Sequence, residues 1–285
     1  VFWKDDIMKR KTIKNQISFN GIGLHKGEKI EINLKPVRDN SGITFKRIDL
    51  SGDNEILVCP ENLFELERGT NIQNSSGAKV YTIEHMMSAL HMLGITDLLI
   101  EIEGNELPIM DGSSIIFVDR IMEASIEELE KEVEPIIIKE PVYFSEEKDG
   151  KHIIALPYDG FKVSYTIDFN HTFLKAQYYE IELNTENYIS EIARARTFCF
   201  DYEIEYMQKH NLALGGSLEN AIVIKKDGVI NPEGLRYETE FVRHKILDLI
   251  GDIYVLNRPI KAHLIAIKAG HFINSNLSKK LKEII

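Results

Sequence analysis

The chain has 285 residues, 44% of them hydrophobic and 28% charged, which is the composition of an ordinary globular protein with one large domain or two smaller ones. Its net charge of −11 argues against a general nucleic-acid binder, because such proteins need a basic surface for the phosphates. No apolar run approaches the ~20 residues that a membrane-spanning helix needs, so we expect no transmembrane segment.

The first half of the chain predicts strands followed by helices. The segment before Met8 lacks a long apolar stretch, so we expect no secretory signal, and Met8 is a candidate start residue. Hydrophobic and polar residues alternate along 28–35, the pattern of a half-buried strand. Thr82 is the candidate N-cap of an apolar helix that Gly94 ends. The predicted elements are strands at 12–20 and 28–35, a helix at 82–93, a strand at 97–103 and a helix at about 114–125.

A glutamate-rich run over residues 127–134 separates the two halves. Because blocks of like charge repel one another and seldom pack, we interpret this run as a solvated helix end and linker. We place the domain boundary there, which gives domains at 8–130 and 131–285. The second half then predicts strands at 136–144, 152–156, 161–168 and 177–183, helices at 185–194 and 201–210, a strand at 220–225, a helix at 238–256, a strand at 262–268 and a helix at 274–284.

The order of elements is similar in the two halves. Both run strands, helix, strand, helix, although no residue-level repeat is visible, so internal duplication is a hypothesis from element order alone. Strands grouped ahead of helices favour layers of the α+β class over a parallel βαβ fold.

The two cysteines, Cys59 and Cys199, are far apart and form no CxxC pair. We therefore expect no disulfide framework and a reducing, cytoplasmic setting. Any zinc site would have to rely mainly on histidine and carboxylate ligands.

One helix face carries the clearest chemical pattern. In the predicted helix 238–256, Asp248 lies about 40° around the axis from His244. Asp252 and Lys245 lie at about 80° and about 100°. The rest of the helix is apolar and should be buried, and buried carboxylates are costly unless they are paired or bind a cation. His244 and Asp248 can share one metal ion at this spacing; the alternative is a simple hydrogen bond or ion pair on the helix face.

Two further histidines have neighbours that suit catalysis. Glu84 directly precedes His85 at the start of an apolar helix, and in zincins a glutamate beside a ligand histidine is the general base. His271 follows a glycine at the end of an apolar strand, where a histidine can serve as a proton donor. Taken alone, each histidine is more readily explained as a structural or surface residue, and Glu84 as a helix-opening acid.

The other histidines have no visible catalytic partner. His25 lies in a glycine-rich turn whose spacing does not match a phosphate-binding loop, and its role is not assigned. The remainder are interpreted as structural or exposed: His91, His152, His171, His210 and His263.

Several short segments, in order along nearly the whole chain, form a set that chance does not explain. They are 18–27 (SFNGIGLHKG), 82–90 (TIEHMMSAL), 104–113 (GNELPIMDGS), 195–198 (ARTF), 236–238 (RYE) with 243–245 (RHK), and 270–271 (GH). Together they closely resemble the UDP-3-O-acyl-N-acetylglucosamine deacetylase family, the zinc amidases that open lipid A synthesis in Gram-negative bacteria. The first seven residues match nothing in the family, and no catalytic position departs from its pattern.

The resemblance implies a fold and a set of roles. It implies two similar two-layer α/β sandwich domains packed face to face, with the active site at their junction. An inserted element at about 200–227 is expected to form an apolar passage for the acyl chain. The implied roles are zinc ligation by His85, His244 and Asp248, general base for Glu84, general acid for His271, orientation of that acid by Asp252, oxyanion stabilisation by Thr197, and substrate contacts by Lys245 and Phe198.

The implied reaction is hydrolysis of the N-acetyl group of UDP-3-O-(3-hydroxyacyl)-N-acetylglucosamine, with release of acetate. Three protein ligands leave one zinc position open for water, and Fe²⁺ is an alternative metal for such a site. The rival hypotheses are a zinc amidase with another N-acyl substrate and a non-catalytic scaffold in which zinc joins the halves. A scaffold would need neither Glu84 nor His271. We expect a monomer, and the preferred acyl length is not predicted.

Overall fold

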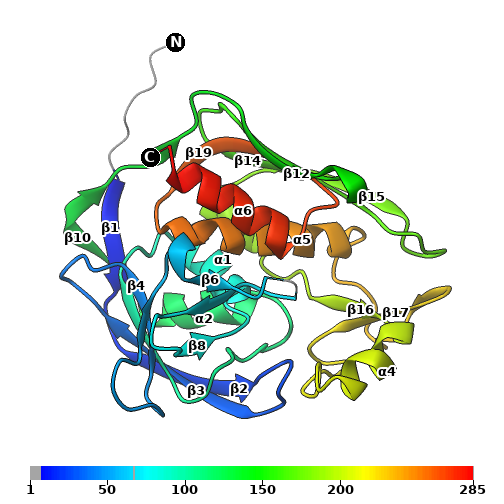
Figure 1. Cartoon of the computed structure of the whole chain (residues 1–285), viewed down its shortest axis with the longest axis horizontal. Helices are drawn as coiled ribbons and strands as arrows, with labels where there is room; N and C mark the ends of the chain where they lie inside the picture. The colour runs from blue at the N-terminus through cyan, green and yellow to red at the C-terminus, as the bar shows by residue number, and fades with distance from the viewer. Residues whose placement is uncertain (1–7, 67, 285) are drawn as a thin grey trace.

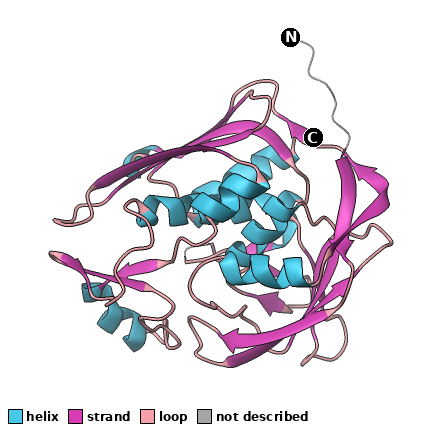
Figure 2. Ribbon diagram, turned by 180° about the vertical axis from the view of Figure 1, so that it is seen from behind, coloured by secondary structure: helices cyan, strands magenta, loops and turns pink. Residues whose placement is uncertain are grey.

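The computed structural model describes residues 8–66 and 68–284, so the predictions for the segment before Met8 lie outside the described residues. Two β-sheets form the outer layers, and helices fill the space between them (Figures 1 and 2). The strands and helices form several separate groups rather than one alternating series, which confirms the predicted α+β class. In these ranges no helix combines the length and apolar character that crossing a bilayer requires.

The first sheet has the strand order β2-β3-β9-β4-β5. Its central strand is β9, which is the last of these five strands in sequence order. β9 pairs antiparallel with β3 and parallel with β4. Ile30, Ile32 and Leu34 of β3 are buried and alternate with more exposed residues, as predicted for 28–35. The elements of this half are β2 (Ile17–Ile22), β3 (Lys29–Pro36), β4 (Ile43–Arg47), β5 (Glu55–Leu57), α1 (Glu84–Leu93), β9 (Leu98–Ile102) and α2 (Ile115–Glu123).

The second sheet repeats this arrangement with the order β12-β13-β19-β14-β15, and β11 also pairs with β19. Its central strand β19 is antiparallel to β13 and parallel to β14, as β9 is to β3 and β4. The shared topology supports the duplication hypothesis. The elements are β11 (Ile136–Ile137), β12 (Val142–Glu146), β13 (Lys151–Leu156), β14 (Phe161–Asp168), β15 (Ala176–Glu182), α3 (Thr185–Glu191), α5 (Glu240–Ile253), β19 (Ile260–Ile267) and α6 (His271–Lys282).

The glutamate-rich run is a strand, so its interpretation as a helix end and linker is wrong. β10 (Ile126–Val133) pairs antiparallel with β1 (Met8–Ile13). Leu129 and Val133 are buried while the charged residues between them are exposed, and the pairing with β1 is irregular between Lys9 and Lys11. Basic residues, chiefly on the neighbouring strand, offset the repulsion among the glutamates. The ion pairs are Lys9–Glu132, Lys11–Glu128 and Arg38–Glu127.

Most other predicted elements are present, with several corrections. The strand predicted at 12–20 is divided between β1 and β2, and the one predicted at 136–144 between β11 and β12. Thr82 does not cap α1: Ile83 occupies the N-cap position and no side chain caps the helix. The short strands between residues 36 and 81 were not predicted; besides β4 and β5 they are β6 (Leu63–Phe64), β7 (Asn71–Gln73) and β8 (Lys79–Val80).

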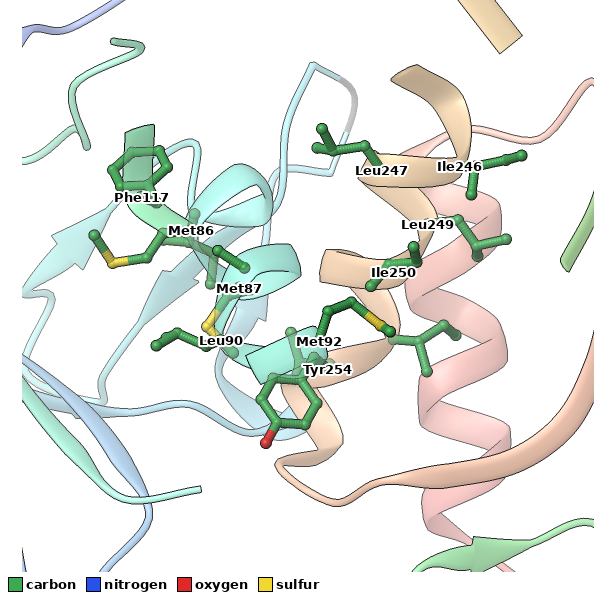
Figure 3. Packing of buried hydrophobic residues seen from close by; sticks show 14 of the residues in the cluster. Met86, Met87, Leu90, Met92, Phe117, Ile246, Leu247, Leu249, Ile250 and Tyr254 are labelled. Atoms are coloured by element: carbon green, nitrogen blue, oxygen red, sulfur yellow. The ribbon is translucent and has the colours of Figure 1, made fainter. Parts of the chain in front are cut away.

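Helices α1 and α5 pack against each other in the centre of the molecule, and Figure 3 shows Met87 and Ile250 among the buried side chains of this layer. The helices approach closely at Gly251, where an added Cβ would lie 2.0 Å from the carbonyl oxygen of Glu84. This close packing brings the start of α1 beside the polar face of α5.

A smaller layer lies to one side of the two main sheets (Figure 1). Parallel strands β16 and β17 form its sheet together with β18, and α4 packs against both β16 and β17. This layer contains residues 200–227, where we expected the inserted element that forms the acyl-chain passage. Its elements are β16 (Phe198–Phe200), α4 (Asp201–Lys209), β17 (Ile222–Lys225) and β18 (Gly228–Val229).

Candidate metal and catalytic site

Three buried side chains from the two central helices converge on one point. His85 is the second residue of α1, and His244 and Asp248 lie one turn apart on α5. The Nε2 atoms of His85 and His244 lie 3.5 Å and 3.3 Å from Asp248 Oδ1. The possible ligand atoms of the three residues all lie within 4.8 Å of one another, which suits a shared metal ion.

The surroundings of these residues fit a bound cation. Among the described residues, Asp248 Oδ1 has no hydrogen-bond partner although it is buried, and an unpaired buried carboxylate oxygen is costly without a cation. The Nδ1 atom of His244 lies 3.1 Å from the carbonyl oxygen of Ala195, which leaves Nε2 to face the site. Burial, opposed by Asp248, lowers the pKa of His244 to about 3 and so favours the neutral imidazole that binds metals.

Glu84 and His271 lie beside the candidate ligands. His271 is the first residue of α6, so it begins a helix rather than ending a strand as predicted. Its Nδ1 atom lies 3.0 Å from Asp252 Oδ2, and its Nε2 atom lies 4.0 Å from both Glu84 Oε1 and Asp248 Oδ2. A carboxylate and an imidazole that could transfer protons therefore face the same point as the possible metal ligands.

The environment shifts the acidity of both groups. Burial raises the pKa of the Glu84 carboxyl, and the nearby imidazoles of His271 and His85 only partly oppose this. Burial alone would lower the pKa of His271, but the carboxylates of Asp252 and Glu84 outweigh it and raise that pKa to about 9. This raised pKa favours the protonated imidazole, which is the form that can donate a proton.

A cavity of about 460 Å³ extends from these residues into the side layer. Lys245 lines it and donates a hydrogen bond of 2.8 Å from Nζ to Asp248 Oδ2. The Nζ atom also lies 5.8 Å from the centre of the Phe198 ring. Thr197 lies next to Phe198 on the same wall. Apolar side chains from the segment 200–227 line the other part of the cavity: Ile204, Met207, Leu218, Ala221 and Val223.

Comparison with known proteins identifies the family. The chain matches the family described as UDP-3-O-acyl N-acetylglycosamine deacetylase over residues 10–283. It is 45% identical over 274 residues to the UDP-3-O-acyl-N-acetylglucosamine deacetylase of Neisseria meningitidis serogroup B, covering 95% of this chain and 89% of that protein. It is 44% identical over 277 residues to the protein of that name from Pseudomonas entomophila, covering 96% and 90%. The chain belongs to this deacetylase family.

Family membership confirms the resemblance seen in the motifs and makes the protein an enzyme, a hydrolase that acts on an amide. Within the enzyme, the structure brings all the predicted site residues to the cavity or into contact with a side chain that lines it. Asp252 is the one that does not line the cavity itself, and it reaches the site through His271. The roles of these residues remain predictions.

Sequence reasoning missed several residues that support the site. Thr70 and Asn274 donate hydrogen bonds to Asp252, and the carbonyl group of Ala195 orients His244. A buried ion pair between Arg196 and Glu240 holds the segment that contains Ala195. Hydroxyl, amide and backbone contacts of this kind leave no periodic pattern, so only the fold reveals them.

Two of the unassigned histidines also have defined surroundings. His25 lines the cavity, and its backbone N–H donates to the buried carboxylate of Glu106 at 2.8 Å. His91 is buried in the core away from the candidate ligands, as its structural interpretation requires.

Proposed function

We propose that this deacetylase hydrolyses the N-acetyl group of UDP-3-O-acyl-N-acetylglucosamine at the site formed by His85, His244 and Asp248. The observation that carries the proposal is that Glu84 and His271, a base and an acid, both face the point where these three residues converge. The reaction would release acetate and the sugar nucleotide with a free 2-amino group.

We propose zinc as the metal, with Fe²⁺ as the alternative. Two imidazole nitrogens and one carboxylate oxygen form a ligand set typical of hydrolytic zinc sites, and iron accepts the same set. A divalent ion held there would supply Lewis-acid activation of water and of the amide carbonyl.

The protein's own residues would carry the protons. Glu84 would accept a proton from the attacking water as the new C–O bond forms. His271, oriented by Asp252, would donate its proton to the amide nitrogen as the C–N bond breaks, so the amine leaves neutral. Thr197 lines the cavity, and its hydroxyl would stabilise the negative charge that develops on the carbonyl oxygen.

The cavity suggests how the substrate would bind. Lys245 would place a cation beside an anionic sugar nucleotide in a protein whose net charge is −11, and Phe198 would contact the sugar. The part of the cavity lined by the apolar side chains of segment 200–227 would take the acyl chain, because apolar side chains favour contact with a hydrocarbon. The two-domain division, the monomeric state and the cytoplasmic setting stay predictions.

The deciding experiment measures deacetylation of UDP-3-O-acyl-N-acetylglucosamine with and without a metal chelator, together with metal content by elemental analysis. Glu84→Ala should keep its metal and lose roughly 10²- to 10⁴-fold in kcat, the usual contribution of general base catalysis. His244→Ala should lose both metal and activity. Unchanged metal content in His244→Ala would refute the ligand assignment, and full activity in Glu84→Ala would remove that residue as the base.

The same assay separates the rival hypotheses. A zinc amidase with another substrate would bind metal in the same way but leave the sugar nucleotide acetylated. The scaffold hypothesis is excluded, because the chain belongs to a family of enzymes.

A further inference from the structure

Thr70 lies between the two carboxylates on which the proposed proton transfers depend. It is completely buried and immediately precedes β7, in a part of the chain where the sequence showed no functional pattern. Its backbone N–H donates a hydrogen bond of 2.9 Å to Glu84 Oε2, and its hydroxyl donates to Asp252 Oδ1. One residue therefore contacts both the candidate base and the carboxylate that orients the candidate acid.

The hydroxyl of Thr70 completes the set of donors around Asp252. Asp252 Oδ1 accepts from Thr70, and Oδ2 accepts from Asn274 Nδ2 at 2.9 Å and lies 3.0 Å from His271 Nδ1. Donors on both oxygens hold the carboxylate plane in one rotation. Since His271 is oriented by that plane, a rotation of Asp252 would turn the imidazole away from Glu84.

Thr70 is itself held firmly. Its carbonyl oxygen accepts a hydrogen bond of 3.0 Å from the backbone N–H of Ile83, the residue just before Glu84. The side chain of its neighbour Asn71 accepts from the N–H of Thr82 and donates to the carbonyl of Glu65. These bonds fix Thr70 and Asn71 to the start of α1. The Thr70 hydroxyl therefore has a defined position relative to Asp252 on α5.

We infer that Thr70 is a positioning residue that fixes the relative geometry of the base and the acid. Its N–H orients Glu84 on α1, and its hydroxyl orients Asp252 on α5, which in turn orients His271 on α6. The inference rests on the roles proposed above for Glu84 and His271.

Thr70→Val tests the hydroxyl alone, because valine keeps the shape of threonine and the backbone N–H that binds Glu84. We expect kcat to fall roughly 10- to 100-fold, the usual effect of removing a hydrogen bond that orients a catalytic group, with KM and metal content nearly unchanged. Thr70→Ser keeps a hydroxyl and should restore most of kcat. If Thr70→Val does not fold, Thr70→Ala removes the same hydroxyl.

Thr96→Val is the matched control. Thr96 is also buried, and its hydroxyl donates to the buried carboxylate of Asp97 at 2.7 Å; neither residue lines the cavity. Its loss should lower the melting temperature without changing kcat. If Thr70→Val behaves like Thr96→Val, with lower stability and normal kcat, Thr70 is only structural and the inference is overturned.

A double-mutant comparison separates this inference from the proposed function. In a His271→Ala background, Thr70→Val should cause little further loss of kcat, because the hydroxyl acts through Asp252 on His271. An equal loss in both backgrounds would overturn the inference. Full activity of His271→Ala alone would instead contradict the proposed acid.

Discussion

His91 is a histidine whose surroundings exclude a catalytic role. Its ring stacks on Tyr254 with centroids 4.2 Å apart and on Phe161 with centroids 5.2 Å apart. Its Nδ1 atom lies 3.1 Å from the carbonyl oxygen of Ile250, so the neutral ring donates there. Burial lowers the pKa of His91 to about 4. The core therefore accepts this side chain only in its uncharged form.

This lowered pKa predicts a loss of stability at mildly acidic pH. The folded value of about 4 lies below the ordinary value of 6.5, so the contribution is complete above pH 6.5 and decreases as the pH falls toward 4. At pH 5 the loss relative to pH 7.5 should be about 2 kcal/mol. His91→Gln cannot titrate and should lack this component.

Urea unfolding of the wild type and of His91→Gln at pH 5 and pH 7.5 measures this loss of stability. Other groups titrate equally in both proteins, so the difference between their pH dependences isolates His91. Parallel pH dependences would show that His91 does not contribute.

The residues of the site differ in how far the sequence could predict them. The spacing of His244 and Asp248 on one apolar helix allowed either a shared cation or a simple ion pair, and adjacency suggested Glu84 as a base. His85 could be joined to them only by family resemblance, because periodicity says nothing about residues on separate helices. Thr70 escaped prediction altogether, since its role depends on where the loop before β7 meets α1 and α5.

At the scale of elements, the crossing of α1 and α5 decides where the site forms. Gly251 allows the approach, because a side chain there would collide with the backbone of Glu84 itself. The residue that limits the helix packing therefore contacts the residue proposed as the base.

Gly251→Ala should thus impair both folding and catalysis. In an ordinary helix this change adds about 0.5–1 kcal/mol of stability. Here the new methyl group would lie 2.0 Å from the Glu84 carbonyl oxygen, and the overpacking should cost about 1–3 kcal/mol and displace the carboxylate. We expect a lower melting temperature and a lower kcat.

Gly228→Ala provides the comparison, because no atom of the described residues lies within 4 Å of the position of its added Cβ. It should leave melting temperature and kcat close to the wild-type values. A Gly251→Ala variant as active and stable as Gly228→Ala would mean that the two helices can separate freely at this point.

The elements also show which parts of the fold hydrophobic periodicity does not predict. Hydrophobic periodicity predicted the long strands and helices, because each buries one face over several residues. The run at 127–134 was misinterpreted because its balancing charges are distant in sequence; the basic residues of β1 lie more than a hundred residues from the glutamates they pair with. The strands β5 to β8 have only two or three residues each, too few to show a period.

At the scale of the whole molecule, two sheets of the same topology place their helices face to face. Each half offers part of the candidate metal site: His85 comes from α1 of the first half, and His244 and Asp248 come from α5 of the second. A metal ion bound by all three would therefore tie the halves together and should stabilise the folded chain as well as serve catalysis.

Removal of the metal should accordingly lower the melting temperature. If zinc binds only the folded protein, a free concentration one thousand times its Kd adds about 4 kcal/mol of stability, which a chelator should abolish. His244→Ala should melt at the same temperature with and without chelator, because it lacks a ligand. His152→Ala alters an exposed histidine on β13 and should keep the full chelator effect. Elemental analysis should first show that the chelator has removed the metal from the wild-type protein. If its melting temperature is then unchanged, the ion does not join the halves.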